Sequence, residues 1–134
     1  MIVVDTNLLV DAYVPRARTP LVEAVLARDP QWAAPLLWRS EFRNVLLRLI
    51  ADGLLHLADA LRIADEAERR MRGGEHQVVS TTVLRLAAAS GCTAYDCEFV
   101  AVAQETASRL VTSDAQVLKA FRGLAITPER FARQ

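Results

Sequence analysis

The sequence predicts an α/β fold, a three-layer α/β/α sandwich whose central sheet is mostly parallel. Residues 2–4, Ile-Val-Val, are three β-branched residues in succession, which is typical of a strand covered by helices on both faces. Apolar residues then restart at helical spacing with Leu8, Leu9 and Tyr13. Residues 109–114, Arg-Leu-Val-Thr-Ser-Asp, repeat this pattern of a short apolar strand, a small hydroxyl residue and a carboxylate before a helix. Strands that alternate with helices in this way favour a parallel sheet between helical layers.

The other elements follow from caps, breakers and apolar spacing. Thr19 as N-cap and Pro20 at the first helical position predict a helix that ends near Arg28. Pro35 ends a short strand, and Gly53 closes a long helix. We expect helices from residue 6 to about 15 and over 20–28, 36–53, 56–74, 81–90, 93–108, 115–121 and 127–133, strands over 31–35 and 124–127, and either a strand or an extended connector over 76–81.

Length and composition restrict the class of protein. The 134 residues suit one compact unit, and we expect a single domain over residues 1–134. No stretch approaches the roughly 18 uncharged apolar residues of a membrane span. The N-terminus lacks the features of a signal peptide, which predicts a cytoplasmic protein. With 16 basic and 16 acidic residues the net charge is zero, so any nucleic-acid binding must be local. Cys92 and Cys97 have no zinc-ligand spacing, and we expect buried or helical thiols.

Four acidic residues lie in apolar or neutral surroundings instead of in charged runs. Asp5 and Asp114 each follow an expected buried strand, and the carboxyl ends of parallel strands meet at the edge of the sheet where ligands bind. Glu41 and Asp96 lie early in expected helices, and Asp96 heads an apolar stripe three, four and seven positions further on. Because ionised carboxylates near a core are costly unless they are compensated, a hard divalent cation such as Mg²⁺ or Mn²⁺ is a natural partner.

Each acid also has a simpler explanation. Asp5, Asp96 and Asp114 suit helix N-caps, and Glu41 can be a partly exposed acid beside neighbouring arginines. A bound ion, or a pair about 4 Å apart, would instead activate water and stabilise the oxygens of a phosphodiester. The residues taken singly leave both explanations open.

The segments around the four acids resemble the motifs of PIN-domain nucleases, and within them the VapC-type toxin ribonucleases of bacterial toxin–antitoxin pairs. VVDTNLLV (residues 3–10) resembles the first motif, a strand that ends in Asp-Thr-Asn or Asp-Thr-Ser. SEFRNVL (40–46) is similar to the helical Glu motif, YDCEFVAVA (95–103) to the third and LVTSDAQVLKAF (110–121) to the fourth. The four matches follow the order and spacing of the family over nearly the whole chain.

This resemblance implies an endoribonuclease that depends on Mg²⁺ or Mn²⁺ and acts on single-stranded or looped RNA. It also implies a toxin of a type II toxin–antitoxin system, a cognate VapB-like antitoxin and a homodimer. Ala115 and Gln116 stand where some members carry a further acid, so a second metal position stays open. By the resemblance the catalytic and metal-binding acids are Asp5, Glu41, Asp96 and Asp114, with Asn7 and Thr112 in supporting positions.

Two alternatives belong to other classes. A catalytically weak PIN fold kept as an RNA- or protein-binding module predicts a missing acid, and none of the four is missing. An aspartyl-phosphate enzyme of the haloacid dehalogenase type uses the Asp after the first strand as a nucleophile. That family requires a second Asp two positions later, where this chain has Asn7.

Basic and aromatic residues suggest where partners bind. Arg16, Arg39 and Arg43 are candidates for steering the RNA backbone. The helices from about residue 20 to 55, with Trp32 and Trp38, are candidates for the groove that holds an antitoxin. Ordinary core packing is the simpler expectation for either tryptophan.

Overall fold

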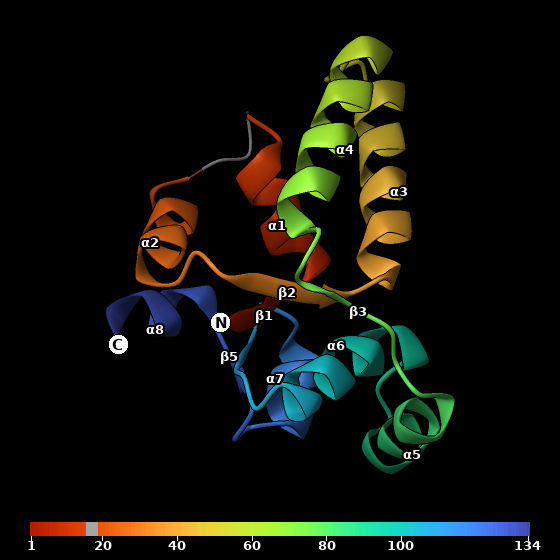
Figure 1. Ribbon diagram of the computed structural model, residues 1–134, viewed down its shortest axis with the longest axis vertical. Coiled ribbons are helices and arrows are strands. Elements are labelled where there is room, and N and C mark those ends of the chain that lie inside the picture. The colour runs from red at the N-terminus through yellow and green to blue at the C-terminus, as the bar shows by residue number, and fades with distance from the viewer. Residues whose placement is uncertain (16–18) are drawn as a thin grey trace.

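The computed structural model describes residues 1–15 and 19–134 (Figure 1). In these residues a five-stranded sheet has the order β3-β2-β1-β4-β5, and every neighbouring pair is parallel. The strands are β1 (Ile2–Val4), β2 (Trp32–Pro35), β3 (Glu75–His76), β4 (Leu110–Val111) and β5 (Ala125–Ile126).

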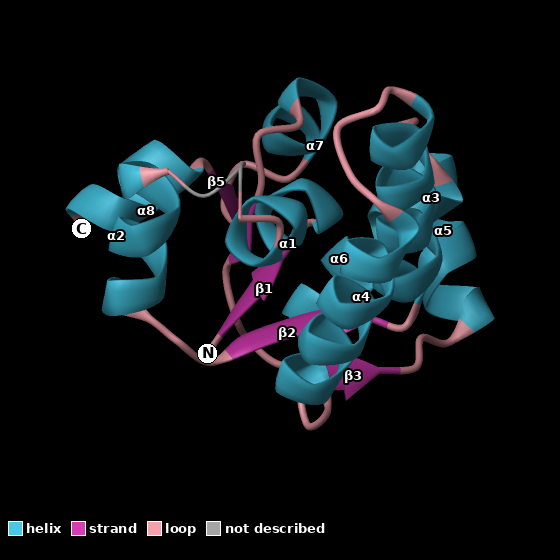
Figure 2. Ribbon diagram, turned by 90° about the horizontal axis from the view of Figure 1, so that it is seen from above, coloured by secondary structure: helices cyan, strands magenta, loops and turns pink. Residues whose placement is uncertain are grey.

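Helices cover both faces of this sheet. In Figure 1, α1, α3 and α4 lie on one side and α5, α6 and α7 on the other, while α3 and α4 project from the sheet as a pair. Figure 2 shows α2 and α8 side by side near the β5 edge. The predicted three-layer α/β/α sandwich is therefore confirmed. The helices are α1 (Thr6–Tyr13), α2 (Pro20–Arg28), α3 (Leu37–Ala51), α4 (Leu57–Met71), α5 (Ser80–Ser90), α6 (Ala94–Glu105), α7 (Ala115–Ala120) and α8 (Pro128–Arg133).

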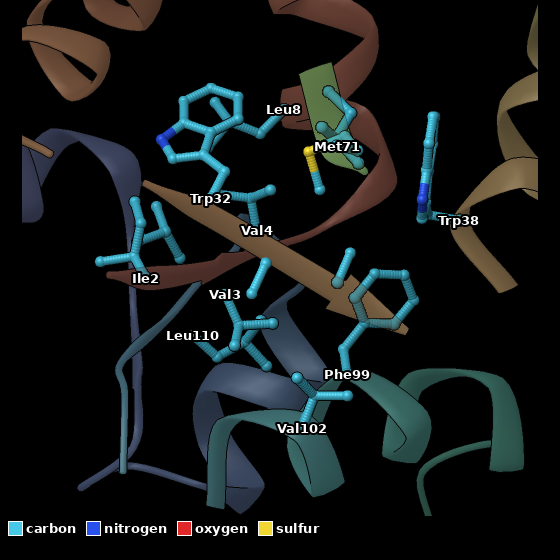
Figure 3. Packing of buried hydrophobic residues seen from close by; sticks show 14 of the residues in the cluster. Ile2, Val3, Val4, Leu8, Trp32, Trp38, Met71, Phe99, Val102 and Leu110 are labelled. Carbon is cyan, nitrogen blue, oxygen red and sulfur yellow. The ribbon is translucent and has the colours of Figure 1, made fainter. Parts of the chain in front are cut away.

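The core lies in two layers that meet at β1. All three β1 residues are buried, as expected for a central parallel strand with helices on both faces. Val3, Phe99 and Leu110 pack on the side of α6, whereas Trp32 and Met71 pack on the opposite side (Figure 3). The position and orientation of β1 are thus fixed from both faces.

Both tryptophans belong to this core. Trp32 is 7% exposed and Trp38 is fully buried, and the Trp38 ring packs edge-to-face on Phe42 with the ring centroids 5.4 Å apart. The expectation of core packing is confirmed for both residues.

The strand order reverses beside β1. The chain passes from β1 through β2 to β3 on one side and then adds β4 and β5 on the other. In open α/β sheets such a switch point leaves a crevice at the carboxyl ends of the strands. Asp5 follows β1 directly, Asp114 follows β4 across two residues, and the backbone N–H of Asp5 donates to the carbonyl of Val111 at 3.3 Å. The fold therefore brings two of the candidate acids to one edge.

The segment over 76–81 is mostly an extended connector. Only Glu75 and His76 pair with β2, and α5 begins at Ser80. The turn before β3 requires Gly74, because a Cβ there would collide with the carbonyl oxygen of Trp32. Within the described ranges, no helix combines the length and the apolar character needed to cross a membrane.

Candidate active site

A pocket of about 320 Å³ opens at the carboxyl ends of β1 and β4. Asp5, which follows β1, meets residues from α1, α3, α6, β4, α7 and the β4–α7 connection in it. The structure brings together every site residue that the sequence suggested, namely Asp5, Asn7, Glu41, Asp96, Thr112 and Asp114.

The Asp5 carboxylate is held at both oxygens. Its Oδ1 accepts the backbone N–H of Leu8 at 2.9 Å, so Asp5 caps α1, and its Oδ2 accepts the hydroxyl of Thr112 at 2.7 Å. Partial burial raises the pKa of Asp5 and the charge of Asp114 adds to this rise, although hydrogen bonds, one from the Ser113 backbone among them, oppose it. Asp5 therefore both caps a helix and faces the pocket.

Asp114 has the same double position after the neighbouring strand, β4. Its Oδ1 accepts the N–H of Val117 at 2.9 Å and caps α7. Its own N–H donates to Thr112 Oγ1 at 3.1 Å, so one threonine connects both carboxylate residues. Asn7 lines the pocket, but the side-chain bond that steadies Asp5 comes from Thr112.

Glu41 reaches the pocket from α3. Its Oε1 accepts the hydroxyl of Thr6 at 2.6 Å, and Thr6 is only 7% exposed. This bond joins the start of α1 to the first turns of α3, so Thr6 positions Glu41 much as Thr112 positions Asp5. Sequence reasoning did not single out Thr6, although a small hydroxyl residue directly after Asp5 was a visible signal.

Asp96 completes the group from the first turn of α6. It does not cap this helix, because the N-cap is Thr93, whose Oγ1 accepts the Asp96 N–H at 3.0 Å. Burial raises the pKa of Asp96, with a further rise from the charge of Asp114. Burial likewise raises the pKa of Glu98, and here the nearby charge is that of Glu41. The pocket thus concentrates negative charge that the chain itself compensates only in part.

The donor set fits a hard divalent ion. Over residues 1–15 and 19–134, no three Asp, Glu, His or Cys side chains lie close enough to form a complete ligand group. Mg²⁺ does not need one, because it is commonly held by one or two carboxylates and keeps several waters. Asp5, Asp96 and Asp114, coupled through their charges, offer oxygen donors alone, which suits Mg²⁺ or Mn²⁺ better than Zn²⁺.

The basic residues around the pocket differ from the expected ones. Arg39 is bound to Glu75 through two hydrogen bonds of 2.6 and 2.7 Å, so its guanidinium is already engaged. Arg43 makes a long contact with Glu68 and does not line the pocket, and Arg16 lies outside the described residues. Arg48, which the sequence did not suggest, lines it instead.

This fold and pocket define the class of protein. The family model described as "PIN domain" matches residues 2–124, so the chain belongs to the PIN domain family and the resemblance in its motifs is confirmed. It is similar to Ribonuclease VapC3 of Pyrobaculum aerophilum, with 27% identity over 130 residues that cover 95% of this chain and 98% of that protein. It also resembles the crystal structure of PAE2754 from Pyrobaculum aerophilum, with a TM-score of 0.74 and 25% identity over 99% of this chain and 97% of that one.

Proposed function

We propose that this chain is a divalent-metal-dependent endoribonuclease that hydrolyses RNA phosphodiester bonds as the toxin of a type II toxin–antitoxin system. One observation carries the proposal: four carboxylates from four separate segments line one pocket at the switch point of the sheet. Membership of the PIN domain family and similarity to a protein named Ribonuclease VapC3 support it.

The residues divide into acids and groups that position them. Asp5, Glu41, Asp96 and Asp114 would hold Mg²⁺ or Mn²⁺, one or two of them directly and the others through waters that the ion keeps. When bound, the ion supplies positive charge that activates a water and stabilises the attacked phosphate. Thr112 fixes the Asp5 carboxylate, and Asn7 offers a further polar group at the rim. The raised pKa values of Asp5 and Asp96 mark acids whose ionised form is stabilised by a cation.

A second groove offers a binding site for a protein partner. It has a volume of about 820 Å³ and lies between α1, α3 and α4, with an apolar floor that includes Val10, Leu49 and Ile63. Val45 lines both this groove and the acid pocket, so a chain bound in the groove would lie next to the site. The groove suits a VapB-like antitoxin, but it is built from α1 and α4 as well as α3 and contains neither tryptophan.

Two finer features complete the proposal. The substrate is single-stranded or looped RNA, as the resemblance to PIN-domain nucleases implies. The active form is a homodimer, as the resemblance to VapC-type toxins implies, and the mass of the purified chain in solution tests this point.

Cleavage of a labelled total-RNA pool tests the function. The purified chain is assayed with Mg²⁺, Mn²⁺ or EDTA beside Asp5→Asn, Asp96→Asn and the surface control Glu129→Gln, and the folding of each protein is checked by thermal melting. We expect discrete fragments from the wild type and the control that disappear with EDTA and in both site variants. Intact RNA from folded, metal-supplied wild type, with RNA binding retained, would favour the binding-module alternative.

A further inference from the structure

Arginines on α3 and α4 are almost all engaged in ion pairs. Among the residues that the structure describes, Arg48 is the exception, because it forms no ion pair although it is exposed and lines the acid pocket. The paired arginines are Arg39 with Glu75 and Glu68, Arg43 with Glu68, Arg62 with Asp59, Arg69 with Asp65 and Arg70 with Glu66.

Arg48 shares one face of α3 with a candidate catalytic acid. Glu41, Asn44, Val45 and Arg48 all line the pocket, and their spacing of three, four and seven positions is that of one helix face. Seven residues correspond to about 10 Å along the helix axis. The face therefore presents a carboxylate at one end and a free guanidinium, next to a side-chain amide, at the other.

We propose that Arg48, together with Asn44, binds a backbone phosphate of the RNA that flanks the phosphate held at the acids; this inference rests on the proposed ribonuclease function. A group of carboxylates repels a polyanion, and a chain of zero net charge offers no general attraction to offset this repulsion. A local cation at the rim offsets it. The planar guanidinium suits this task because it can donate two parallel hydrogen bonds to phosphate oxygens.

A structural role gives a different expectation. Arg48 lies in the last turn of α3, where a cation interacts favourably with the helix dipole. That role affects the stability of the helix and leaves the affinity for RNA unchanged. The salt dependence of RNA binding separates the two roles, because each phosphate contact releases counterions on binding.

The test measures binding of a fluorescently labelled single-stranded RNA in EDTA, from about 50 to 200 mM salt, the range over which phosphate contacts have a large effect on affinity. The proteins are the wild type, Arg48→Ala, Arg48→Lys and the matched control Arg43→Ala, which changes an arginine on the same helix outside the pocket. Thermal melting of each variant shows that it is folded.

We expect Arg48→Ala to bind about 10-fold more weakly at low salt. The slope of log affinity against log salt should become shallower by about 0.7, the value for one phosphate contact on a single strand. Arg48→Lys should keep the slope and lose part of the affinity, and Arg43→Ala should match the wild type. Equal affinity and slope for Arg48→Ala and Arg43→Ala would overturn the Arg48 assignment alone, whereas a wild type that neither binds this RNA nor cleaves the total-RNA pool with Mg²⁺ or Mn²⁺ would overturn the proposed function with it.

Discussion

Residues of α3 contribute to two acidic sites, Glu75 and the pocket acids, and the chain neutralises the negative charge of these two sites to different degrees. At the start of β3, Glu75 accepts two hydrogen bonds from Arg39 and one from Trp38 Nε1 at 2.8 Å, and the Arg39 bonds lower the pKa of Glu75. In the pocket, burial raises the pKa values of Asp5 and Asp96.

The difference separates a structural acid from candidate functional ones. The chain supplies a full set of donors for Glu75, so this carboxylate is stable without a ligand. Asp5 receives its hydrogen bonds from uncharged donors, the N–H groups of Leu8 and Ser113 and the hydroxyl of Thr112, and the charge of Asp114 raises the pKa values of Asp5 and Asp96. Such uncompensated charge at a switch point favours a cation as ligand. Substitutions at the two sites should therefore have opposite consequences for stability and activity.

The largest expected effect comes from Asp114. We expect Asp114→Asn to lower RNA cleavage by about 10²- to 10³-fold, the usual range for loss of one electrostatic group in an active site. Its stability should not fall, because an Asn oxygen can still accept the Val117 N–H and the repulsion with Asp5 and Asp96 is removed. Cleavage rates and urea unfolding, measured on the same preparation, check both parts.

Asp114→Ala provides the matched comparison. This variant removes the cap as well as the charge, so its stability should fall by about 1 kcal/mol. Its rate of RNA cleavage should fall as much as that of the Asn variant. If Asp114→Asn cleaved RNA as fast as the wild type, the role of Asp114 would be capping alone.

The second effect concerns stability at Glu75. Glu75→Gln leaves Arg39 beside a neutral partner, and since the Glu75 side chain is only 11% exposed we expect a loss of about 2 kcal/mol in urea unfolding. Activity per folded molecule should stay within about twofold of wild type, a change of less than 0.5 kcal/mol in the barrier. Glu66→Gln, which alters the exposed pair with Arg70, is the control and should lose at most about 0.5 kcal/mol.

The stability difference between wild type and Glu75→Gln should depend on pH in one direction. The pKa of Glu75 is lower in the folded chain than in the unfolded chain, so its contribution is complete at neutral pH, above the ordinary glutamate pKa of about 4.3. The contribution disappears as the pH falls through the lowered value. The gap between wild type and Glu75→Gln should therefore stay constant from neutral pH to about pH 5 and close in stronger acid. A gap that widened in acid would contradict this account of Glu75.

Much of this fold and site could be predicted because its signals are local. A β-branched run identifies β1, Thr19 and Pro20 define the start of α2, and Gly91 ends α5 in the left-handed conformation with φ of 76°. The acids at the ends of β1 and β4 follow from the rule that parallel strands end at one edge.

The unpredicted features depend on tertiary partners. Arg39 looked free in the sequence, but its partner Glu75 lies 36 residues away and reaches it only because β3 pairs with β2. The bond from Thr6 to Glu41 likewise depends on how α1 and α3 are placed, and the exposure of Arg48 depends on which face of α3 turns to the pocket. No local pattern reports these placements.

The smallest effect tests one of these unpredicted contacts. Thr6→Val keeps the shape and β-branching of the side chain but removes the hydroxyl that donates to Glu41. We expect kcat to fall about 10-fold, with KM little changed and a stability loss of about 1 kcal/mol, the usual value for one hydrogen bond. Thr6→Ser retains the donor and should restore most of the activity. If the Val and Ser variants had equal kcat values, the Thr6 hydroxyl would not position Glu41 for catalysis. The contrast between compensated and uncompensated acids would then depend on Asp5, Asp96 and Asp114 alone.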